Sequence, residues 1–346
     1  MANGLQTFTP EIRSPLISIL LNGLRGEAMR RRARERLGIS SPMLEARLSA
    51  VPLTRYVALF EELAIYHRDP LLGAHLGMSQ TAADALGPLG FLLLAMPTMG
   101  QGLEAVARYI STWQTGTTVV LNHSRDEAFW SYRIDDSKIW PRQQDSEYTL
   151  AVMCSAMRSR LNPGWRPLEV HFEHEKPASA SALRSLFQAP IRFSQPVNQF
   201  VLDPTELDLP YQTPFACFIP YVEEYLRALI PQHTVAPDIV SQVHNAVRGA
   251  MSHREISLDW VSQTLQISPR TLQRQLATNG TNLRKIIQEV RENEAAALLQ
   301  TGQRRRTDIA HALGYSDHTA LWRASRSWSN RSPKTNSKSS TELKKC

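Results

Sequence analysis

The feature that most constrains this fold is a short helix, tight turn and second helix that the C-terminal third encodes twice. In the first copy, residues 257–265 carry Leu258, Val261 and Leu265 on one face of a short helix. The chain restarts with Ser268, a residue type that favours helix N-caps, and Pro269, which suits the first helical position. Residues 307–313, 314–316 and 317–328 repeat this plan. We therefore expect an all-α C-terminal domain with two helix-turn-helix units.

The second helix of each unit presents polar side chains away from its apolar face. Leu272 and Leu276 are expected to face inward, which leaves Arg270, Gln273 and Arg274 outward. In a DNA major groove, arginine can donate two hydrogen bonds to guanine and glutamine can pair with adenine. The candidate DNA-contacting residues are Arg270, Thr271, Gln273 and Arg274 in the first unit, and His318, Thr319 and Arg323 in the second.

A helix is also expected between the two units. Residues 282–300 are rich in Glu and Ala and carry Leu283, Ile286 and Val290 at helical spacing. At 1.5 Å per residue this linker helix would span about 28 Å, which is close to one DNA turn of about 34 Å. It could therefore place two recognition helices in successive major grooves. The alternative is an ordinary bundle of short helices, because helix-turn-helix patterns alone are only moderately specific.

The charge of the chain is distributed unevenly. The 346 residues carry 39 Lys and Arg against 32 Asp and Glu, a net charge of +7. Residues 238–346 contain 17 of the basic and 9 of the acidic residues, which leaves 22 and 23 for residues 1–237. All of the positive excess is therefore C-terminal, which favours a polyanionic partner such as DNA for that part. A basic, solvated tail is the alternative.

The first two thirds mix helices with short strands. Because strict β-α-β alternation is missing, an α+β domain is favoured over a doubly wound sheet. The hydrophobic patterns predict helices at 14–24, 53–66, 86–96, 103–113, 146–160, 181–187 and 220–229, and strands at 117–122, 128–134, 168–172, 191–193 and 199–202. A dense run of arginines at 30–36 is interpreted as one exposed helix face. The expected domains are residues 1–210 for sensing and dimerisation, 211–237 for a linker and connecting helix, 238–333 for DNA binding, and 334–346 for a disordered tail.

Several functional classes find little support in the sequence. Three widely spaced cysteines build neither a disulfide framework nor a CxxC metal site, and Cys154 and Cys217 are expected to be buried and inert. His171 and His174 are three residues apart in a strand and turn, which disfavours a shared metal. No cofactor motif or catalytic signature is recognised. The longest apolar run, residues 91–96, is too short for a bilayer, so we expect a cytoplasmic protein with no metal, cofactor or membrane partner.

The C-terminal motifs resemble the DNA-binding domain of the AraC/XylS family of transcription regulators. The matching segments, in the order and spacing of the family, are 267–274, 282–284, 290–291 and 309–317, followed by Ser332-Pro333. Upstream, residues 73–77, 86–90, 97–98 and 171–174 are similar to the arabinose-binding-type N-terminal domain of one subgroup. The resemblance implies a domain that senses a small molecule and mediates dimers, although the subgroup name does not make arabinose the ligand.

The second unit departs from the family pattern. Where the family has an aromatic-rich Ser-Ala-Phe-x-Arg-Ala-Phe, this chain reads Thr-Ala-Leu-Trp-Arg-Ala-Ser over residues 319–325. Ser325 in place of a buried phenylalanine should cost about 3 kcal/mol or more, Trp322 is unexpectedly exposed, and Asn330 replaces a helix-ending glycine. An impaired second recognition helix is therefore one of the hypotheses.

The leading hypothesis is a sequence-specific transcription regulator, an activator, with promoter DNA and a small-molecule effector as partners, a homodimeric state, and RNA polymerase as a candidate contact. Trp113, Trp130, Trp140 and Trp165 could line the effector pocket, or could belong to the core alone. The effector-binding residues stay unknown at this level. The alternative from another class is a repair-type enzyme that its basic domain tethers to DNA.

Overall fold

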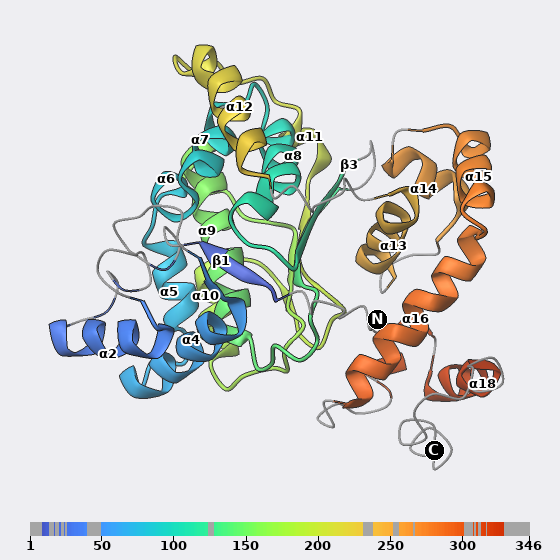
Figure 1. Ribbon diagram of the computed structural model, residues 1–346, viewed down its shortest axis with the longest axis horizontal. Coiled ribbons are helices and arrows are strands. Elements are labelled where there is room, and N and C mark those ends of the chain that lie inside the picture. The colour runs from blue at the N-terminus through green and yellow to red at the C-terminus, as the bar shows by residue number, and fades with distance from the viewer. Residues whose placement is uncertain are drawn as a thin grey trace, which may run out of the picture. The chain divides into compact units, whose positions relative to one another are not determined.

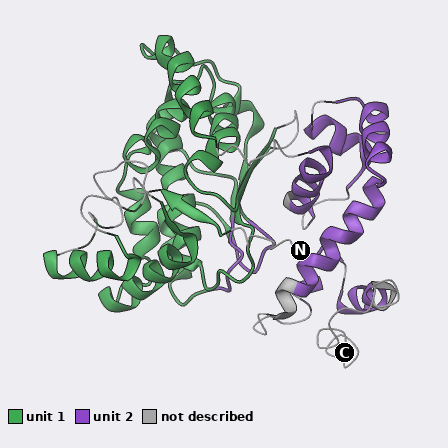
Figure 2. Cartoon of the chain, viewed as in Figure 1, with its two compact units in different colours: residues 1–170, 177–191, 198–234 green, residues 171–176, 192–197, 235–346 purple. Residues whose placement is uncertain are grey.

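The computed structural model divides the chain into two compact units. Unit 1 comprises residues 1–170, 177–191 and 198–234, and unit 2 comprises residues 171–176, 192–197 and 235–346 (Figure 2). The structure describes residues 9–13, 17, 21, 24, 26–39, 50–123, 128–230, 238–251, 256–265, 267–300, 307, 309–310, 313–315 and 317–328.

A five-stranded sheet forms one layer of the N-terminal part, in the order β3-β4-β7-β5-β6. An antiparallel hairpin of β3 (Thr117–His123) and β4 (Ala128–Ile134) forms one side of it, and the middle strand β7 (Asn198–Leu202) pairs antiparallel with β4. Beyond β7 lie β5 (Glu169–His171) and β6 (Ile191–Arg192), so β3 and β6 are the edge strands. The hairpin agrees with the alternating pattern of the sequence, because the side chains of successive strand residues point to opposite faces.

Helices cover the sheet of unit 1 (Figure 1). They are α4 (Leu53–His67), α5 (Leu72–Met78), α6 (Ala82–Leu86), α7 (Pro88–Ala95), α8 (Met99–Tyr109) and the long α9 (Gln143–Arg160). The smaller elements are β1 (Glu11–Arg13), α2 (Glu27–Leu37), β2 (Ala50–Pro52), η1 (Ile110–Thr112), α10 (Ala180–Phe187), α11 (Pro204–Leu207), η2 (Ala216–Phe218) and α12 (Ile219–Leu229). This mixture confirms the predicted α+β class.

Glycine allows a very close contact between two helices in unit 1. A Cβ on Gly73 would lie 2.1 Å from the carbonyl oxygen of Gln144, and one on Gly77 would lie 2.6 Å from that of Tyr148. The backbones of α5 and α9 can therefore touch only because these two residues lack side chains. The contact also fixes the start of α9, since the backbone N–H of Gly73 donates to Oε1 of Gln144 at 2.8 Å.

The predicted helices of unit 1 are confirmed over most of their lengths. The exception is 14–24, most of which lies outside the described residues. The arginine run lies on α2, whose buried residues are Ala33 and Leu37, and Arg36 pairs with Glu62 of α4 at 3.0 Å. These arginines therefore act mainly as a charged outer helix face.

Apart from residues 171–176 and 192–197, the described residues of unit 2 form helices and the turns between them. The helices are α13 (Ile239–Ala250), α14 (Leu258–Thr264), α15 (Pro269–Thr278), α16 (Leu283–Gln300) and α18 (His318–Trp328). Helix α13 packs against α14, α15 and α16, with Val243, Val247 and Val290 fully buried. Arg248 of α13 and Glu294 of α16 add an ion pair of 2.9 Å. The all-α C-terminal region with a linker helix is thus confirmed.

Candidate nucleic-acid interface and sensor cavity

The first recognition helix, α15, begins as the sequence predicts. Ser268 is its N-cap, and the side chain accepts a hydrogen bond from the backbone N–H of Thr271 at 3.1 Å. The hydroxyl of Thr271 lies 2.8 Å from that of Ser268, so Thr271 also takes part in the cap. Pro269 occupies the first turn, where its missing N–H costs nothing. The cap fixes where α15 starts and therefore which side chains face outward.

One face of α15 is buried and the opposite face is free for a partner. Leu272 and Leu276 are 0% and 1% exposed, while Arg270, Gln273 and Arg274 are exposed. At 100° per residue, Arg270 and Arg274 lie nearly opposite the buried leucines. Thr271 is half-buried and lies at the edge of this strip. The predicted residues of the first unit therefore share one accessible face, with two guanidinium groups available for a polyanion.

The linker helix α16 has the predicted position and length. The side chain of Asn282 accepts from the backbone N–H of Lys285 at 2.9 Å and so caps the helix start. Its 18 residues span about 27 Å. Ile286 and Val290 are fully buried on the side that packs against α13. A hydrophobic contact therefore holds this helix beside the first helix-turn-helix unit.

The second unit is described in part. Ile309, Ala310 and Leu313 are buried, and Gly314 adopts a φ of 73°, where a Cβ would lie 2.4 Å from the carbonyl oxygen of Met251. The guanidinium of Arg291 on α16 lies 4.9 Å from the ring centre of Tyr315. The turn before α18 is thus anchored on both α16 and the segment after α13.

Helix α18 carries the predicted polar strip of the second unit. Its N-terminal cap is Asp317, whose side chain accepts from the backbone N–H of Ala320 at 2.8 Å. His318, Thr319 and Arg323 are all exposed. Each predicted DNA-contacting residue therefore lies on the recognition helix of its own unit, with its side chain accessible except for that of the half-buried Thr271.

The residues of α18 that differ from the family pattern have the solvent exposure that the sequence predicts. Ser325 is 6% exposed, so a small polar side chain occupies a core position. Its hydroxyl donates to the carbonyl oxygen of Trp322 at 2.8 Å, and Trp322 itself is 37% exposed. Asn330 lies outside the described residues. Helix α18 thus buries less apolar area, and exposes more of it, than a helix with the family's sequence pattern would.

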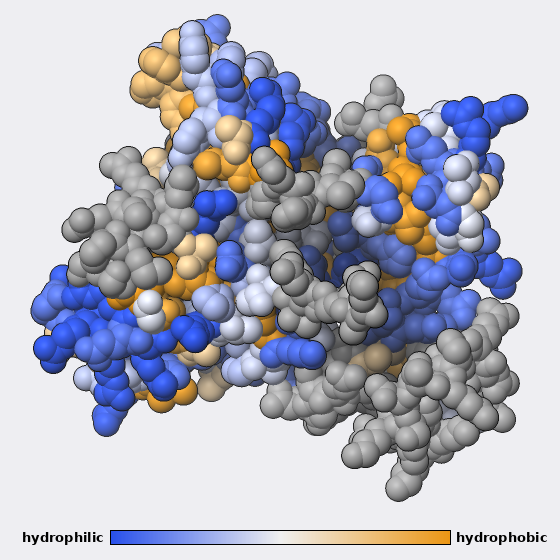
Figure 3. All heavy atoms as spheres, viewed as in Figure 1, coloured by the Kyte–Doolittle hydropathy of each residue, from blue (hydrophilic) through white to orange (hydrophobic). Residues whose placement is uncertain are grey.

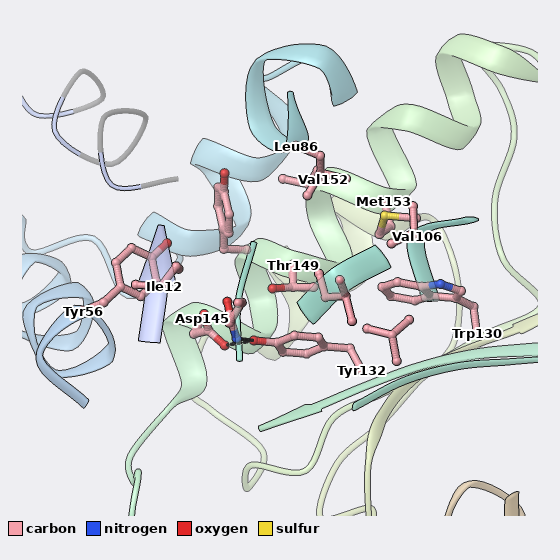
Figure 4. A pocket seen from close by; sticks show the side chains of 14 residues that line it. Ile12, Tyr56, Leu86, Val106, Trp130, Tyr132, Asp145, Thr149, Val152 and Met153 are labelled. Atoms are coloured by element: carbon pink, nitrogen blue, oxygen red, sulfur yellow. Dashed lines mark hydrogen bonds between the residues drawn. The ribbon is translucent and has the colours of Figure 1, made fainter. Parts of the chain in front are cut away.

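A cavity of about 40 Å³ lies inside unit 1 (Figure 4). Three of its polar side chains form a chain of hydrogen bonds: Gln114 Nε2 donates to the hydroxyl of Tyr132 at 3.0 Å, and this hydroxyl donates to Oδ2 of Asp145 at 2.7 Å. Burial raises the pKa of Tyr132 well above its ordinary value, and the Asp145 carboxylate raises it further. The remaining lining residues are Ile12, Tyr56, Leu86, Val106, Ile110, Val119, Trp130, Tyr148, Thr149, Val152 and Met153.

The lining is mostly apolar and includes one acidic side chain. Among the described residues that line the cavity, Asp145 is the single carboxylic acid and none is a lysine, arginine or histidine. The indole N–H of Trp130 is buried and has no hydrogen-bond partner among the described residues. Such a lining is complementary to a small, largely apolar molecule.

The four tryptophans that the sequence suggested for one pocket do not lie together in the structure. Trp130 lines the cavity, whereas Trp113 and Trp165 are buried elsewhere, and Trp165 donates to Oε2 of Glu206 at 2.8 Å. Trp140 is half-buried beside the guanidinium of Arg142. Tyr132 and Asp145 are not among the site residues that the sequence pattern predicts. The alternation of strand β4 could have placed Tyr132 on the same face as Trp130.

Catalytic and metal-binding candidates receive no support from the geometry. Burial raises the pKa of the Cys154 thiol to about 11, which disfavours a nucleophilic thiolate. Cys217 is exposed, so the prediction that it is buried is wrong: η2 is a surface turn that leaves no residue of its own buried. Among the described residues, no group of three or more His, Cys, Asp or Glu could hold a metal ion. Within the same residues, no helix is long and apolar enough to cross a membrane.

Comparison with known families decides the assignment. Residues 28–211 match the arabinose-binding domain of AraC transcription regulators, N-terminal, and residues 261–339 match a helix-turn-helix domain. This chain belongs to the AraC family of transcription regulators. The first match covers the five-stranded sheet, α9 and every cavity-lining residue except Ile12 of this AraC-family protein, and the second covers α15, α16 and α18.

The chain is also similar to two regulators of known name and to one solved structure. The chain is 25% identical over 285 residues to the HTH-type transcriptional regulator VirS of Mycobacterium tuberculosis, covering 82% of this chain and 83% of VirS. It is 23% identical over 269 residues to the ornithine utilization regulator of Pseudomonas aeruginosa, covering 77% and 78%. The crystal structure of the transcriptional regulator CdpR from Pseudomonas aeruginosa is 20% identical, with a TM-score of 0.42 over 93% of this chain and 99% of CdpR.

Proposed function

We propose that this AraC-family protein is a sequence-specific activator of transcription that binds promoter DNA as a homodimer and responds to a small-molecule effector in the cytoplasm. The observation that carries the proposal is the exposed strip of Arg270, Gln273 and Arg274 on the capped helix α15. Residues 1–210 would sense the effector and dimerise, 211–237 would connect the domains, and 238–333 would bind DNA. RNA polymerase would be the further contact of an activator.

Each exposed side chain has an assigned role in this proposal. Arg270 and Arg274 would contact base edges or phosphates, and Gln273 and Thr271 would contribute at the border of the same groove. His318, Thr319 and Arg323 would act in the adjacent groove. Because α16 spans about 27 Å, the two helices would contact sites about one duplex turn apart.

The Arg274→Ala substitution tests whether the exposed strip of Arg270, Gln273 and Arg274 recognises the DNA sequence. It should weaken binding to DNA from the region flanking the coding sequence by about 1 to 3 kcal/mol and relax the base preference at one position. Fluorescence anisotropy with labelled duplexes would measure both effects. Lys285→Ala is the matched control, because it removes one exposed positive charge from α16 without changing α15. Equal losses for the two variants on all sequences would reject a base-reading role for Arg274.

The effector part of the proposal rests on the cavity between β4, α8 and α9. Its lining favours a compact, largely apolar molecule that can accept a hydrogen bond from Trp130. A volume of about 40 Å³ holds only a few water-sized groups, so a larger effector requires a movement of the cavity wall. Binding there would shift the population of DNA-competent states through its differential affinity for them.

A small apolar probe tests the cavity. We expect 1-propanol to raise the melting temperature of the purified protein, because its apolar chain suits the lining and its hydroxyl can accept a hydrogen bond from Trp130. Absence of stabilisation by 1-propanol would contradict the proposed effector class.

A second candidate function is a regulator that reads DNA through α15 alone. Ser325 and Trp322 favour it, because a buried serine weakens the packing of α18. Footprinting of the purified protein on its flanking DNA, with and without candidate effectors, distinguishes the two. Protection of two adjacent major grooves supports paired reading, and protection of one supports the single-helix alternative.

A further inference from the structure

Helix α18 carries one large apolar side chain among its exposed polar ones. Trp322 is 37% exposed, and in the part of unit 2 that the structure describes it is the one large hydrophobic residue that is exposed. The exposed residues of α15 include no large hydrophobic side chain. Figure 3 shows hydrophilic side chains projecting from the outer side of α15, at the upper right where Figure 1 labels this helix. The exposed indole therefore distinguishes the two recognition helices.

The position of Trp322 on α18 places it beside the residues that are predicted to contact DNA. At 100° per residue, Trp322 lies about 40° from His318 and about 60° from Thr319 around the helix axis, between the two. Arg323 is the next residue along the chain, and all four are exposed. The inner side of the helix carries Ser325, which is 6% exposed. A partner that binds the polar strip of α18 therefore also meets the indole.

The side chains around Trp322 match the chemistry of a DNA major groove. His318 and Thr319 offer hydrogen-bond donors and acceptors, and Arg323 offers a charged donor. Base edges in the major groove present donors and acceptors together with one apolar group, the C5-methyl of thymine. A lipid or an apolar protein surface would instead leave the polar side chains beside the indole without hydrogen-bond partners, which costs free energy. The mixed strip therefore favours base edges that include a methyl group.

We propose that Trp322 recognises the C5-methyl group of a pyrimidine in the second major groove, and so specifies thymine or 5-methylcytosine near the base that Arg323 contacts. The inference deepens the DNA-binding part of the proposed function and rests on it. The family's sequence pattern leaves this position open, as the x of Ser-Ala-Phe-x-Arg-Ala-Phe, and this chain has an indole there. The proposed contact is therefore a property of this chain and is not implied by its family.

The exposed area of the indole is large enough for such a contact. A tryptophan can bury up to about 250 Å², so an exposed fraction of 37% leaves roughly 90 Å² for a partner to cover. Removing one methyl group from water changes an affinity about fourfold, the equivalent of roughly 0.8 kcal/mol. Covering Trp322 also favours the docked state of α18, because only that state removes the indole from water. DNA would therefore offset part of the packing that Ser325 loses.

Replacing single thymines by deoxyuridine tests the contact without changing the protein. Deoxyuridine pairs with adenine as thymine does but lacks the C5-methyl group. Fluorescence anisotropy would measure binding of the full-length wild type to its footprinted DNA, with each thymine of the second protected groove replaced in turn. We expect one replacement to weaken binding about fourfold. With a C·G pair at the same position, methylating the cytosine at C5 should tighten binding by about the same factor. If no replacement weakens binding, the proposal is wrong.

Variants at Trp322 show whether the indole is responsible. Trp322→Ala should bind the thymine and deoxyuridine duplexes equally, whereas Trp322→Phe, which keeps an apolar ring, should keep part of the difference. Alanine favours helix, so α18 should still form, and circular dichroism melting checks this. Tyr66→Ala is the matched control, since it removes an aromatic side chain that is 63% exposed on α4, and it should keep the full difference. A methyl effect of unchanged size in Trp322→Ala would overturn the proposal.

The same measurements separate this inference from the function on which it rests. If the wild type protects two grooves but no methyl effect depends on Trp322, the inference is wrong and the regulatory function stands. If only the groove of α15 is protected, α18 does not dock, so the inference fails while the single-helix alternative stands. If the wild type prefers no DNA sequence, the proposed function itself fails, and the inference falls with it.

Discussion

Glu147 makes the stability of unit 1 depend on pH in an unusual direction. It lies on α9 and is fully buried, and burial raises the pKa of its carboxyl from 4.5 to about 8. Gln143 donates a hydrogen bond to Oε1 of Glu147 at 2.8 Å and opposes this shift, whereas the nearby Glu61 and Asp69 carboxylates add to it. The folded chain therefore keeps this carboxyl protonated at neutral pH, while the unfolded chain ionises it.

The direction in which stability changes with pH follows from the number of protons that the folded and unfolded states bind. Between pH 4.5 and 8 the folded state binds more protons at Glu147, so its contribution to stability is present below the unfolded pKa and is lost as the pH rises toward the folded one. Linkage gives a loss of roughly 1 kcal/mol at pH 5 and about 4 kcal/mol at pH 8. Glu147→Gln, which resembles the protonated carboxyl in size, removes this dependence. We therefore expect the variant to be more stable than the wild type by about 4 kcal/mol at pH 8 and by about 1 kcal/mol at pH 5.

Urea unfolding followed by tryptophan fluorescence at the two pH values would measure the difference, with Glu104→Gln on the exposed face of α8 as the matched control. The control should change stability by less than about 0.5 kcal/mol at either pH. An equal effect of Glu147→Gln at pH 5 and pH 8, or a stability advantage that grows as the pH falls, would refute the assignment of a neutral, buried carboxyl.

Three further predictions concern packing, capping and reactivity. Gly90→Ala would place a Cβ 1.9 Å from the carbonyl oxygen of Ala82, so it should destabilise unit 1 by about 3 kcal/mol in thermal unfolding, whereas Gly164→Ala, which meets only a side-chain atom at 3.4 Å, should have little effect. Ser268→Ala should destabilise α15 by about 1 kcal/mol and lower DNA affinity, and Ser268→Asp should restore the cap; unchanged unfolding of Ser268→Ala would argue against the cap. Iodoacetamide at neutral pH should label Cys217 and spare Cys154, as peptide mass mapping can check; fast labelling of Cys154 in the native protein would contradict its burial.

Local signals made much of the fold predictable. Capping residues such as Ser257 and Ser268, the proline at 269 and the apolar spacing of α16 act within a few residues of one another, so the C-terminal helices could be located closely. The hairpin of β3 and β4 follows equally from alternation within each strand. The same capping and periodicity fix which side of α15 is exposed, and this is why Arg270, Gln273 and Arg274 could be selected from the sequence.

The cavity could not be located in the same way. Gln114, Tyr132 and Asp145 come from the segment before β3, from β4 and from α9, and their hydrogen bonds depend on how these elements pack. No local pattern encodes such a contact, because the packing of distant elements decides it. The prediction that Cys217 is buried is wrong for a related reason. Its apolar neighbours predicted burial, but they belong to a surface on which η2 and α12 leave apolar side chains exposed within the chain.

The second helix-turn-helix unit shows how one substitution connects packing with recognition. Ser325 removes apolar area from the inner face of α18, but its hydroxyl is satisfied by the carbonyl oxygen of Trp322, so no buried polar group is left unpaired at that side chain. The expected cost is therefore one of lost packing, which would lower the fraction of molecules with α18 in its folded position. Because apparent affinity scales with the fraction that is competent to bind, contacts from His318, Thr319 and Arg323 would be weakened together rather than one by one. Protection of the second groove thus reports the folding of α18 as much as the chemistry of its side chains.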